Sequence, residues 1–443
     1  CKTIRSAANG KARWRRPATY QRDALLLRWP DVLTHDDART SEPPVTRRER
    51  RTFAFDSIRI ATDGVGVSLI QTVTLVIAIK VFAAPDALKS LLASAANIGQ
   101  LASLFVTAAL ARRAIRPNSI ASAMGVASAV ALAASAVASR ALGFSIFVAA
   151  ALMLFQLRLP FIAAIHEHNY PAQRRGRRFS IGLILMVVVS LAFDLGAGQL
   201  LEIDLDWYRS LLGAGAAMLL VGGLALAFVP SRAAPVADGG NPFRNLRILK
   251  TDRLFRRFII AWFILGFSNL WTVPLRVVYL AEAERGMGRS RLLVMMIAGV
   301  IPQLTRLSLS RVWANLFDRL HLVKIRIILA IFLASGIFLY FLTESLPVVI
   351  AGQILINVAF SGGPILWNLW VTRIAPPGRS SIYMSVHIFM TGVRGTLAPA
   401  IGFLAVAGIS FRLVGTISLV GIVAAILILI PMRHEPRAAP PSR

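Results

Sequence analysis

A series of apolar segments, each about as long as a bilayer is thick, constrains this chain more than any other feature. A helix rises about 1.5 Å per residue, so roughly 20 apolar residues cross the hydrocarbon core. Backbone polar groups in lipid must be satisfied within the segment, so helices are expected and strands are not. We count 12 such segments, with approximate limits 55–83, 87–110, 117–139, 142–168, 179–201, 207–229, 257–281, 291–313, 325–344, 347–371, 381–408 and 412–432.

The composition agrees with a membrane protein. The chain is 56% hydrophobic and only 16% charged, whereas a soluble globular chain is about 25% charged. This excludes an ordinary soluble enzyme, and the hydrophobicity excludes intrinsic disorder. A net charge of +28 could indicate nucleic-acid binding, but the basic residues lie between apolar segments. No nucleic-acid partner is therefore expected.

The chain divides into two halves around a linker rich in Gly, Pro and charge. The predicted organisation is a basic tail (1–52), a six-helix bundle (53–230), a linker (231–256), a second six-helix bundle (257–433) and a C-terminal tail (434–443). Two pairs of loops agree on an offset of 206 residues, because Leu110 corresponds to Leu316 and Pro171 to Pro377. This agreement indicates duplicated halves.

The distribution of Lys and Arg predicts the orientation. If the N-terminus is inside, the inner loops and tails hold 36 Lys and Arg, and the outer loops hold 8. Cytoplasmic loops carry the excess of positive charge. Both termini are therefore predicted to be cytoplasmic. We expect the protein to lie in a bacterial inner membrane and to be a monomer.

Between the eighth and ninth segments, residues 313–324 read WANLFDRLHLVK. This segment resembles an inner-loop signature of the major facilitator superfamily of transporters, in which Asp318 and Arg319 match the acid and the base. Ala314 stands where Gly is usual, and the equivalent first-half loop, 110–116, keeps the bases but has no acid. The loop 171–176 also fits the family, and segments 363–370 and 387–399 resemble a less-studied bacterial branch.

The resemblance covers about residues 53–433. It implies alternating access, in which two bundles rock about a central cavity lined mainly by helices 1, 4, 7 and 10. Asp318 and Arg319 would then form a charge pair at an inner gate.

We single out five arginines within the predicted spans, where a charge is expensive and is by default a functional hypothesis. Arg59 and Arg276 lie near span ends, and we expect structural roles, with Arg59 reaching the interface. Arg158, Arg306 and Arg394 lie deeper and are predicted to bind the charge of a substrate. For Arg394, the alternative is an interhelical pair that stabilises one conformer.

Two deep carboxylates, Asp63 and Asp194, are candidates for proton coupling. Burial and a nearby cation shift the pKa of a carboxyl group in opposite directions, so a group balanced between them could bind and release a proton. The alternative is a static ion pair, for example between Asp194 and Arg158. Asp56 and Glu167 lie near inner span ends and are expected at the interface.

Polar residues recur at helical spacing in the second half. Gln353, Asn357, His387 and Asn269 are predicted to supply hydrogen bonds to a substrate. The alternative is hydrogen bonding between helices, worth about 0.6–2 kcal/mol per bond.

No metal, cofactor or catalytic activity is predicted. His166 and His168 are two residues apart and do not converge on a helix, and no phosphate-binding loop is present. The chain is therefore expected to be a secondary transporter, and not an enzyme or a primary pump.

The predicted function is transport of a small anionic or carboxylate-bearing solute, coupled to protons, because deep Arg outnumber deep Asp. Two alternatives stay open: an efflux transporter for amphipathic drugs, and a membrane sensor or scaffold with a transporter fold.

Overall fold

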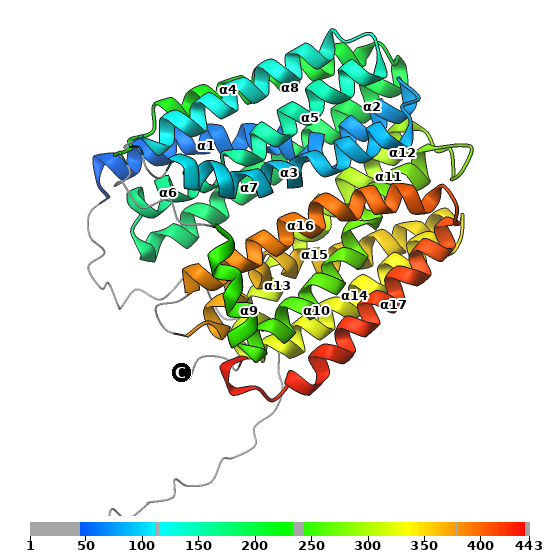
Figure 1. The fold of residues 1–443 in the computed structure, drawn as a ribbon. Coiled ribbons are helices and arrows are strands. Elements are labelled where there is room, and N and C mark those ends of the chain that lie inside the picture. Colours follow the sequence, from blue (N-terminus) through cyan, green and yellow to red (C-terminus); the bar gives the residue numbers. More distant parts are fainter. Residues whose placement is uncertain (1–44, 111–112, 114, 234–241, 377–379, 439–443) are drawn as a thin grey trace, which may run out of the picture. The chain divides into compact units, whose positions relative to one another are not determined.

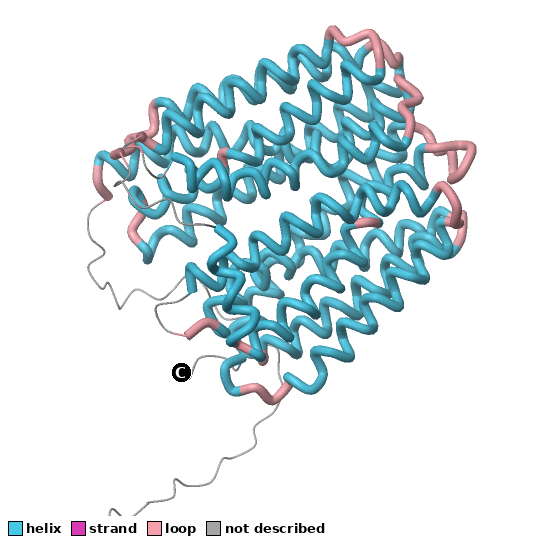
Figure 2. Tube along the Cα trace, viewed as in Figure 1, coloured by secondary structure: helices cyan, strands magenta, loops and turns pink. Residues whose placement is uncertain are grey.

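In the computed structural model, the described residues are 45–110, 113, 115–233, 242–376 and 380–438. Within these ranges the chain forms helices joined by short connections at the two ends of the molecule, without a strand (Figure 2). Among the described residues, twelve helical segments are long and apolar enough to cross a membrane. The predicted fold class, twelve spanning helices in two bundles, is confirmed.

The first bundle contains six spans. The first span contains a π-helical turn, and the fourth is interrupted at Arg158. The elements are α1 (Arg47–Ser68), η1 (Leu69–Val73), α2 (Thr74–Lys80), α3 (Asp86–Leu110), α4 (Pro117–Ala136), α5 (Ala141–Leu157), α6 (Leu159–Asn169), α7 (Ala172–Ile203) and α8 (Trp207–Ala227).

The second bundle also contains six spans, preceded by two short helices. Its second span carries another π-helical turn. The elements are η2 (Pro242–Arg247), α9 (Ile248–Thr251), α10 (Arg253–Leu270), α11 (Thr272–Ala281), α12 (Arg291–Met295), η3 (Met296–Val300), α13 (Ile301–Arg319), α14 (Leu322–Leu342), α15 (Leu346–Ile374), α16 (Ser380–Val406), α17 (Phe411–Leu429), η4 (Ile430–Met432) and η5 (Pro436–Ala438).

The two bundles repeat one packing scheme (Figure 1). In the first, α1 packs on α7 and α8, α3 packs on α5, and α4 packs on α5 and α8. In the second, α10 packs on α16 and α17, α13 packs on α15, and α14 packs on α15 and α17. Each contact in one bundle therefore has a counterpart in the other, as the common offset between the two halves predicts.

The helix pairs that join the bundles include α3 with α16, α7 with α12 and α13, and α2 with α11. Small residues allow close approach at these contacts. A Cβ atom on Gly198 of α7 would lie 3.1 Å from the side chains of Leu292 and Met295, and one on Gly395 of α16 would overlap Asn97 of α3. The interface between the bundles is therefore shaped to close tightly.

Charged residues also join the bundles at the end opposite the start of α1, which we call the opposite end. Lys89 of α3 pairs with Glu282 of the connection after α11. Arg285 of the same connection holds the Asp86 carboxylate with two bonds, of 2.7 and 2.8 Å. Bidentate pairs of this kind are geometrically specific, so this end of the bundle interface is fastened in the state described.

The first helix begins earlier than predicted, within the segment expected to be a tail. Arg47 is its first residue, and the Thr46 side chain caps it by accepting the Glu49 backbone N–H at 3.1 Å. This cap satisfies a free N–H of the first turn. The rest of the predicted tail, residues 1–44, lies outside the described residues, as do residues 234–241 of the linker and 439–443 at the C-terminus.

We predict that Gly223→Leu destabilises the first bundle, because Gly223 of α8 meets Gly125 of α4. A Cβ at Gly223 would lie 2.8 Å from the backbone nitrogen of Val126. Overpacking of this kind costs about 1–3 kcal/mol, and a lower midpoint of thermal unfolding in detergent would show it. Gly213→Leu is the matched control on the same helix, because a Cβ at Gly213 meets nothing within 4 Å. Equal midpoints for the two variants would contradict the prediction.

Candidate functional site

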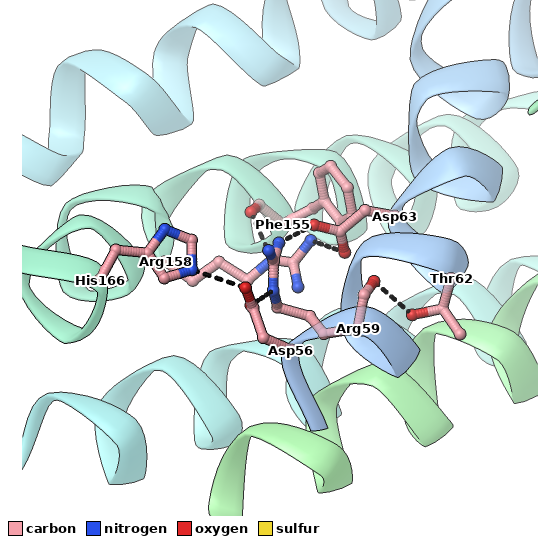
Figure 3. Close-up of polar contacts among 7 residues, drawn as sticks. All are labelled: Asp56, Arg59, Thr62, Asp63, Phe155, Arg158 and His166. Atoms are coloured by element: carbon pink, nitrogen blue, oxygen red, sulfur yellow. Dashed lines mark hydrogen bonds and ion pairs between the residues drawn. The ribbon is translucent and has the colours of Figure 1, made fainter. Parts of the chain in front are cut away.

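Five charged or titratable side chains of the first bundle form a buried network that we call the Asp63 network (Figure 3). Its members are Asp56, Arg59, Asp63, Arg158 and His166. Asp63 accepts from Arg158 at 2.5 Å and from Arg59. Arg59 also donates from Nε to Asp56 at 2.7 Å, and His166 Nε2 lies 2.8 Å from the other Asp56 oxygen. Two carboxylates therefore face two guanidinium groups, and the charges balance.

The fourth span positions Arg158 by breaking there. Pro160 follows two residues later and cannot donate to a carbonyl of the preceding turn. Arg158 Nε instead donates to the Phe155 carbonyl at 2.9 Å, and its guanidinium lies 4.0 Å from the Phe155 ring centroid. Phe155 packs where Gly66 of α1 has no side chain. The break therefore turns Arg158 toward α1.

The network corrects two expectations. Arg59 does not extend to solvent, because it is 5% exposed and paired with two aspartates. Asp56 is buried and paired with Arg59, and its depth in the membrane stays a prediction. Arg158 pairs with Asp63, and not with Asp194. Charge spacing could have indicated this arrangement, because Arg59 follows Asp56 by three residues and precedes Asp63 by four, which places all three on one helix face.

Asp194 of α7 occupies a different environment, which we call the Asp194 junction. Its carboxyl accepts from the Ser68 hydroxyl of α1. Across the bundle interface it faces Gly299, where an added Cβ would lie 2.7 Å from the carboxyl carbon of Asp194. Asp194 is 1% exposed. Within the described part of the chain, no ion pair to it is observed.

Two π-helical turns meet at the Asp194 junction. Ser68 directly precedes η1 of the first bundle, and Gly299 belongs to η3 of the second. The two turns contact each other and α7. One helical turn before Asp194 along α7, Ser190 accepts a hydrogen bond from Gln303 at 3.1 Å across the same interface. Such turns occur frequently at functional sites. The sequence pattern gave no signal for Ser68 or Gly299.

The polar residues predicted to bind substrate in the second bundle are buried. Gln353, Asn357, His387 and Asn269 are each at most 7% exposed. Asn357 donates to the Gln353 backbone carbonyl at 2.8 Å, as expected for hydrogen bonding within a helix. Asn269 Oδ1, Gln353 Oε1 and His387 Nε2 have no hydrogen-bond partner among the described residues. Buried polar atoms rarely stay unpaired, so these three are suited to bind water or a ligand.

The deep arginines of the second bundle differ from Arg158 in having no carboxylate partner among the described residues. Arg394 donates to the Trp262 carbonyl, but its Nε has no partner. Arg306 and Arg276 both approach the Phe360 ring, at 5.3 and 5.9 Å from its centroid. Arg276 is also buried, as expected for a structural residue.

The predicted inner gate is only partly described. The Asp318 side chain lies outside the described residues, and the Arg319 side chain is exposed. The gate therefore stays a prediction. No group of three potential metal-ligating side chains is found among the described residues.

A polar contact holds the start of α10 to the C-terminal segment. Asp252 lies outside the spans and accepts from the Phe255 backbone N–H, from Tyr383 and from Arg437. Burial acts to raise the pKa of Asp252, but these hydrogen bonds hold it below its usual range. The contribution of Asp252 to stability is therefore present at neutral pH and is lost as the pH falls through its pKa.

The sequence profile of the Major Facilitator Superfamily matches residues 61–399 of this chain. No curated protein sequence matches it. Among solved structures, the nucleoside transporter NupG has a TM-score of 0.64 at 13% identity, covering 87% of this chain and 98% of that chain. The E. coli xylose transporter XylE, partially occluded and inward open, has a TM-score of 0.63 at 15% identity, covering 88% and 98%.

A bacterial homologue of the human lysosomal transporter Spinster, inward-facing and occupied, has a TM-score of 0.62 at 14% identity. It covers 88% of this chain and 96% of that chain. These likenesses show a common fold, and the family match spans most of the chain. The chain is an integral membrane protein that belongs to the Major Facilitator Superfamily of transporters.

Proposed function

We propose that this protein is a proton-coupled secondary transporter that moves a small anionic solute by alternating access. The family and the twelve spans support transport. The excess of Lys and Arg in one set of loops supports cytoplasmic termini in a bacterial inner membrane. The opposite end would then face outward. The Asp194 junction is the observation that carries the proposal.

The fastened opposite end represents one state of the cycle. Lys89, Glu282, Asp86 and Arg285 hold the bundles together there. Ion pairs that join two bodies can stabilise one arrangement, and rocking of the bodies must break them. The cycle would therefore alternate between this state and one in which the outward-facing pairs are broken.

Asp194 is the proposed proton carrier. A buried charge without a counter-ion costs several kcal/mol, whereas the neutral acid fits this position with the Ser68 hydroxyl as its partner. Separation of the bundles would withdraw Gly299 and hydrate the carboxyl group. Proton binding would thus favour bundle contact, and proton release would favour separation. One structural relative is a D-xylose–proton symporter, which supports coupling of this kind in the fold.

Asp63 is less suited to carry the proton in this state. Its carboxylate pairs with Arg59 and Arg158, so protonation would leave guanidinium charge uncompensated inside the bundle. We assign the Asp63 network to holding α1 against the broken fourth span. Arg158 would contribute to substrate binding only where Asp63 releases it.

The proposed cargo is anionic because the second bundle carries cations with unpaired donors. Arg394 and Arg306 would bind the charge of the solute. Asn269, Gln353, Asn357 and His387 would contribute hydrogen bonds. Buried oxygens and nitrogens without partners support the placement of polar ligand groups near them.

We predict that Asp194→Asn separates solute exchange from proton-driven accumulation. The amide keeps the shape and the hydrogen bond but cannot release a proton. Proteoliposomes given a panel of radiolabelled organic anions should show exchange by this variant at a rate near that of the wild type. Accumulation driven by a pH gradient should fall about tenfold or more, the loss of roughly 1.4 kcal/mol of coupling.

Asp63→Asn is the comparison for this experiment. It leaves the buried Arg158 guanidinium without its carboxylate partner, which costs about 3–5 kcal/mol. This variant should unfold at a lower temperature and lose exchange and accumulation together. Undiminished accumulation by Asp194→Asn would contradict the proposed proton site.

We also predict that breaking the ion pairs at the opposite end exposes the bundle interface there. Ser94 of α3 donates to the Thr396 carbonyl of α16 at 3.0 Å and is buried. A cysteine at Ser94, with Cys1 replaced by Ser, should react faster with an impermeant maleimide when Lys89→Gln and Arg285→Gln are combined. Arg209→Gln is the control, because Arg209 is exposed at the same end. Equal labelling rates in all three backgrounds would show that the pairs do not hold the interface.

A further inference from the structure

The two bundles balance their buried charge differently. The first bundle pairs its deep arginines with aspartates in the Asp63 network. The six spans of the second bundle contain no Asp or Glu, yet Arg276, Arg306, Arg326 and Arg394 lie inside them. An uncompensated cation at membrane depth is energetically costly. Within its spans, the second bundle therefore has no acidic residue to balance these arginines.

Part of this cationic set is concentrated in one place, which we call the Arg394 cluster. It draws on α10, α14, α15 and α16. Its members are Trp262, Arg326, Trp370, His387 and Arg394. Arg326 was not predicted as a site residue, because it is only the fifth residue of its helix and was assigned to the inner loop.

Ring contacts hold the Arg394 cluster together. The Arg326 guanidinium lies 4.1 Å from the centroid of the Trp262 ring, and Trp262 stacks on Trp370 at 4.8 Å. The His387 ring meets the edge of Trp370 at 5.1 Å. Arg394 donates to the Trp262 carbonyl and occupies the space that Gly266 leaves free. The rings give the cluster apolar walls, which strengthen any electrostatic contact inside it.

Four nitrogen atoms of the cluster have no hydrogen-bond partner among the described residues. They are Arg326 Nε, Arg394 Nε, Trp370 Nε1 and His387 Nε2. Three of the four can only donate, and the histidine nitrogen donates in one tautomer. Trp370 and His387 are at most 1% exposed, and Arg394 is 7% exposed. The missing partner must therefore be an acceptor, and two guanidinium groups favour one with negative charge.

We propose that the Arg394 cluster binds an oxyanion, of the carboxylate or phosphate class. Planar guanidinium groups match such oxygens with two parallel bonds, and the indole N–H adds a third donor. The Trp262 and Trp370 faces are covered by their neighbours, so the ligand is recognised by its oxygens and not by stacking on these rings. As the anionic end of the cargo, this ligand rests on the proposed transport function.

The test is thermal unfolding of the purified full chain in detergent. The probes are sodium phosphate, sulfate, acetate and benzoate, compared with sodium chloride at constant ionic strength. At least one oxyanion should raise the unfolding midpoint of the wild type in a saturable manner. Arg394→Gln and Arg326→Gln should each abolish the rise. Lys324→Gln should retain it, because Lys324 is exposed two residues from Arg326 on the same helix.

Two outcomes would overturn the proposal. One is a wild type that no oxyanion, including the lipid below, stabilises beyond chloride, and the other is stabilisation that survives both glutamine substitutions. If those variants do not unfold cooperatively, Arg394→Lys and Arg326→Lys keep the charge but lose the planar donors. Their apparent affinity should then fall about tenfold or more, and unchanged affinity would count against the site.

A lipid arm distinguishes the source of the anion and separates this proposal from the transport function. The same unfolding is measured in micelles doped with phosphatidylglycerol or with phosphatidylcholine. Stabilisation by the anionic lipid alone, lost in Arg394→Gln, would support the oxyanion site and assign it to a headgroup. Anion flux in proteoliposomes that both glutamine variants retain would support transport but remove the Arg394 cluster from it.

Discussion

The requirement that a buried charge must have a partner governs this protein, and the two bundles meet it in different ways. In the first bundle, Asp63 and Asp56 neutralise Arg158 and Arg59, so these four charges balance without a ligand. The second bundle has cations and no acidic residue inside its spans. The two bundles pack similarly but distribute charge differently. The deep arginines of the first bundle have carboxylate partners. Those of the second bundle have none among the described residues, which favours binding of an external anion.

The interface between the bundles also carries a buried ionisable group, Asp194. Glycines at Gly198, Gly299 and Gly395 let helices approach closely there, and two π-helical turns meet beside the carboxyl group. Close packing excludes water, so the charge state of Asp194 and the contact between bundles depend on each other. This dependence is a direct physical link between a proton and a rocking motion, and it needs no contact between the proton and the solute.

Hydropathy and loop spacing predicted the twelve spans and the duplicated packing, because bilayer thickness and helix geometry leave few alternatives. The ion-pair partners of the buried charged residues were harder to predict. The sequence offered Arg158 a choice of aspartates, and only the helix break near Pro160 directs it to Asp63. The role of Gly299 depends on which helices face each other across the interface. Arg326 was overlooked because its place in the chain resembles a loop anchor, although the absence of acidic residues from six spans was visible in the sequence.

Alternating access is the central claim, and the distance between bundles at the two ends tests it most directly. Spin labels at Ala87 and Ser345 report on the opposite end, and labels at Ser119 and Lys324 report on the other; all four positions are exposed, and Cys1 is replaced by Ser. Pulsed electron paramagnetic resonance in nanodiscs should give two distances for each pair, with populations that change reciprocally between acidic and neutral pH. A single distance for both pairs, unchanged by pH, would contradict the account and favour a static scaffold.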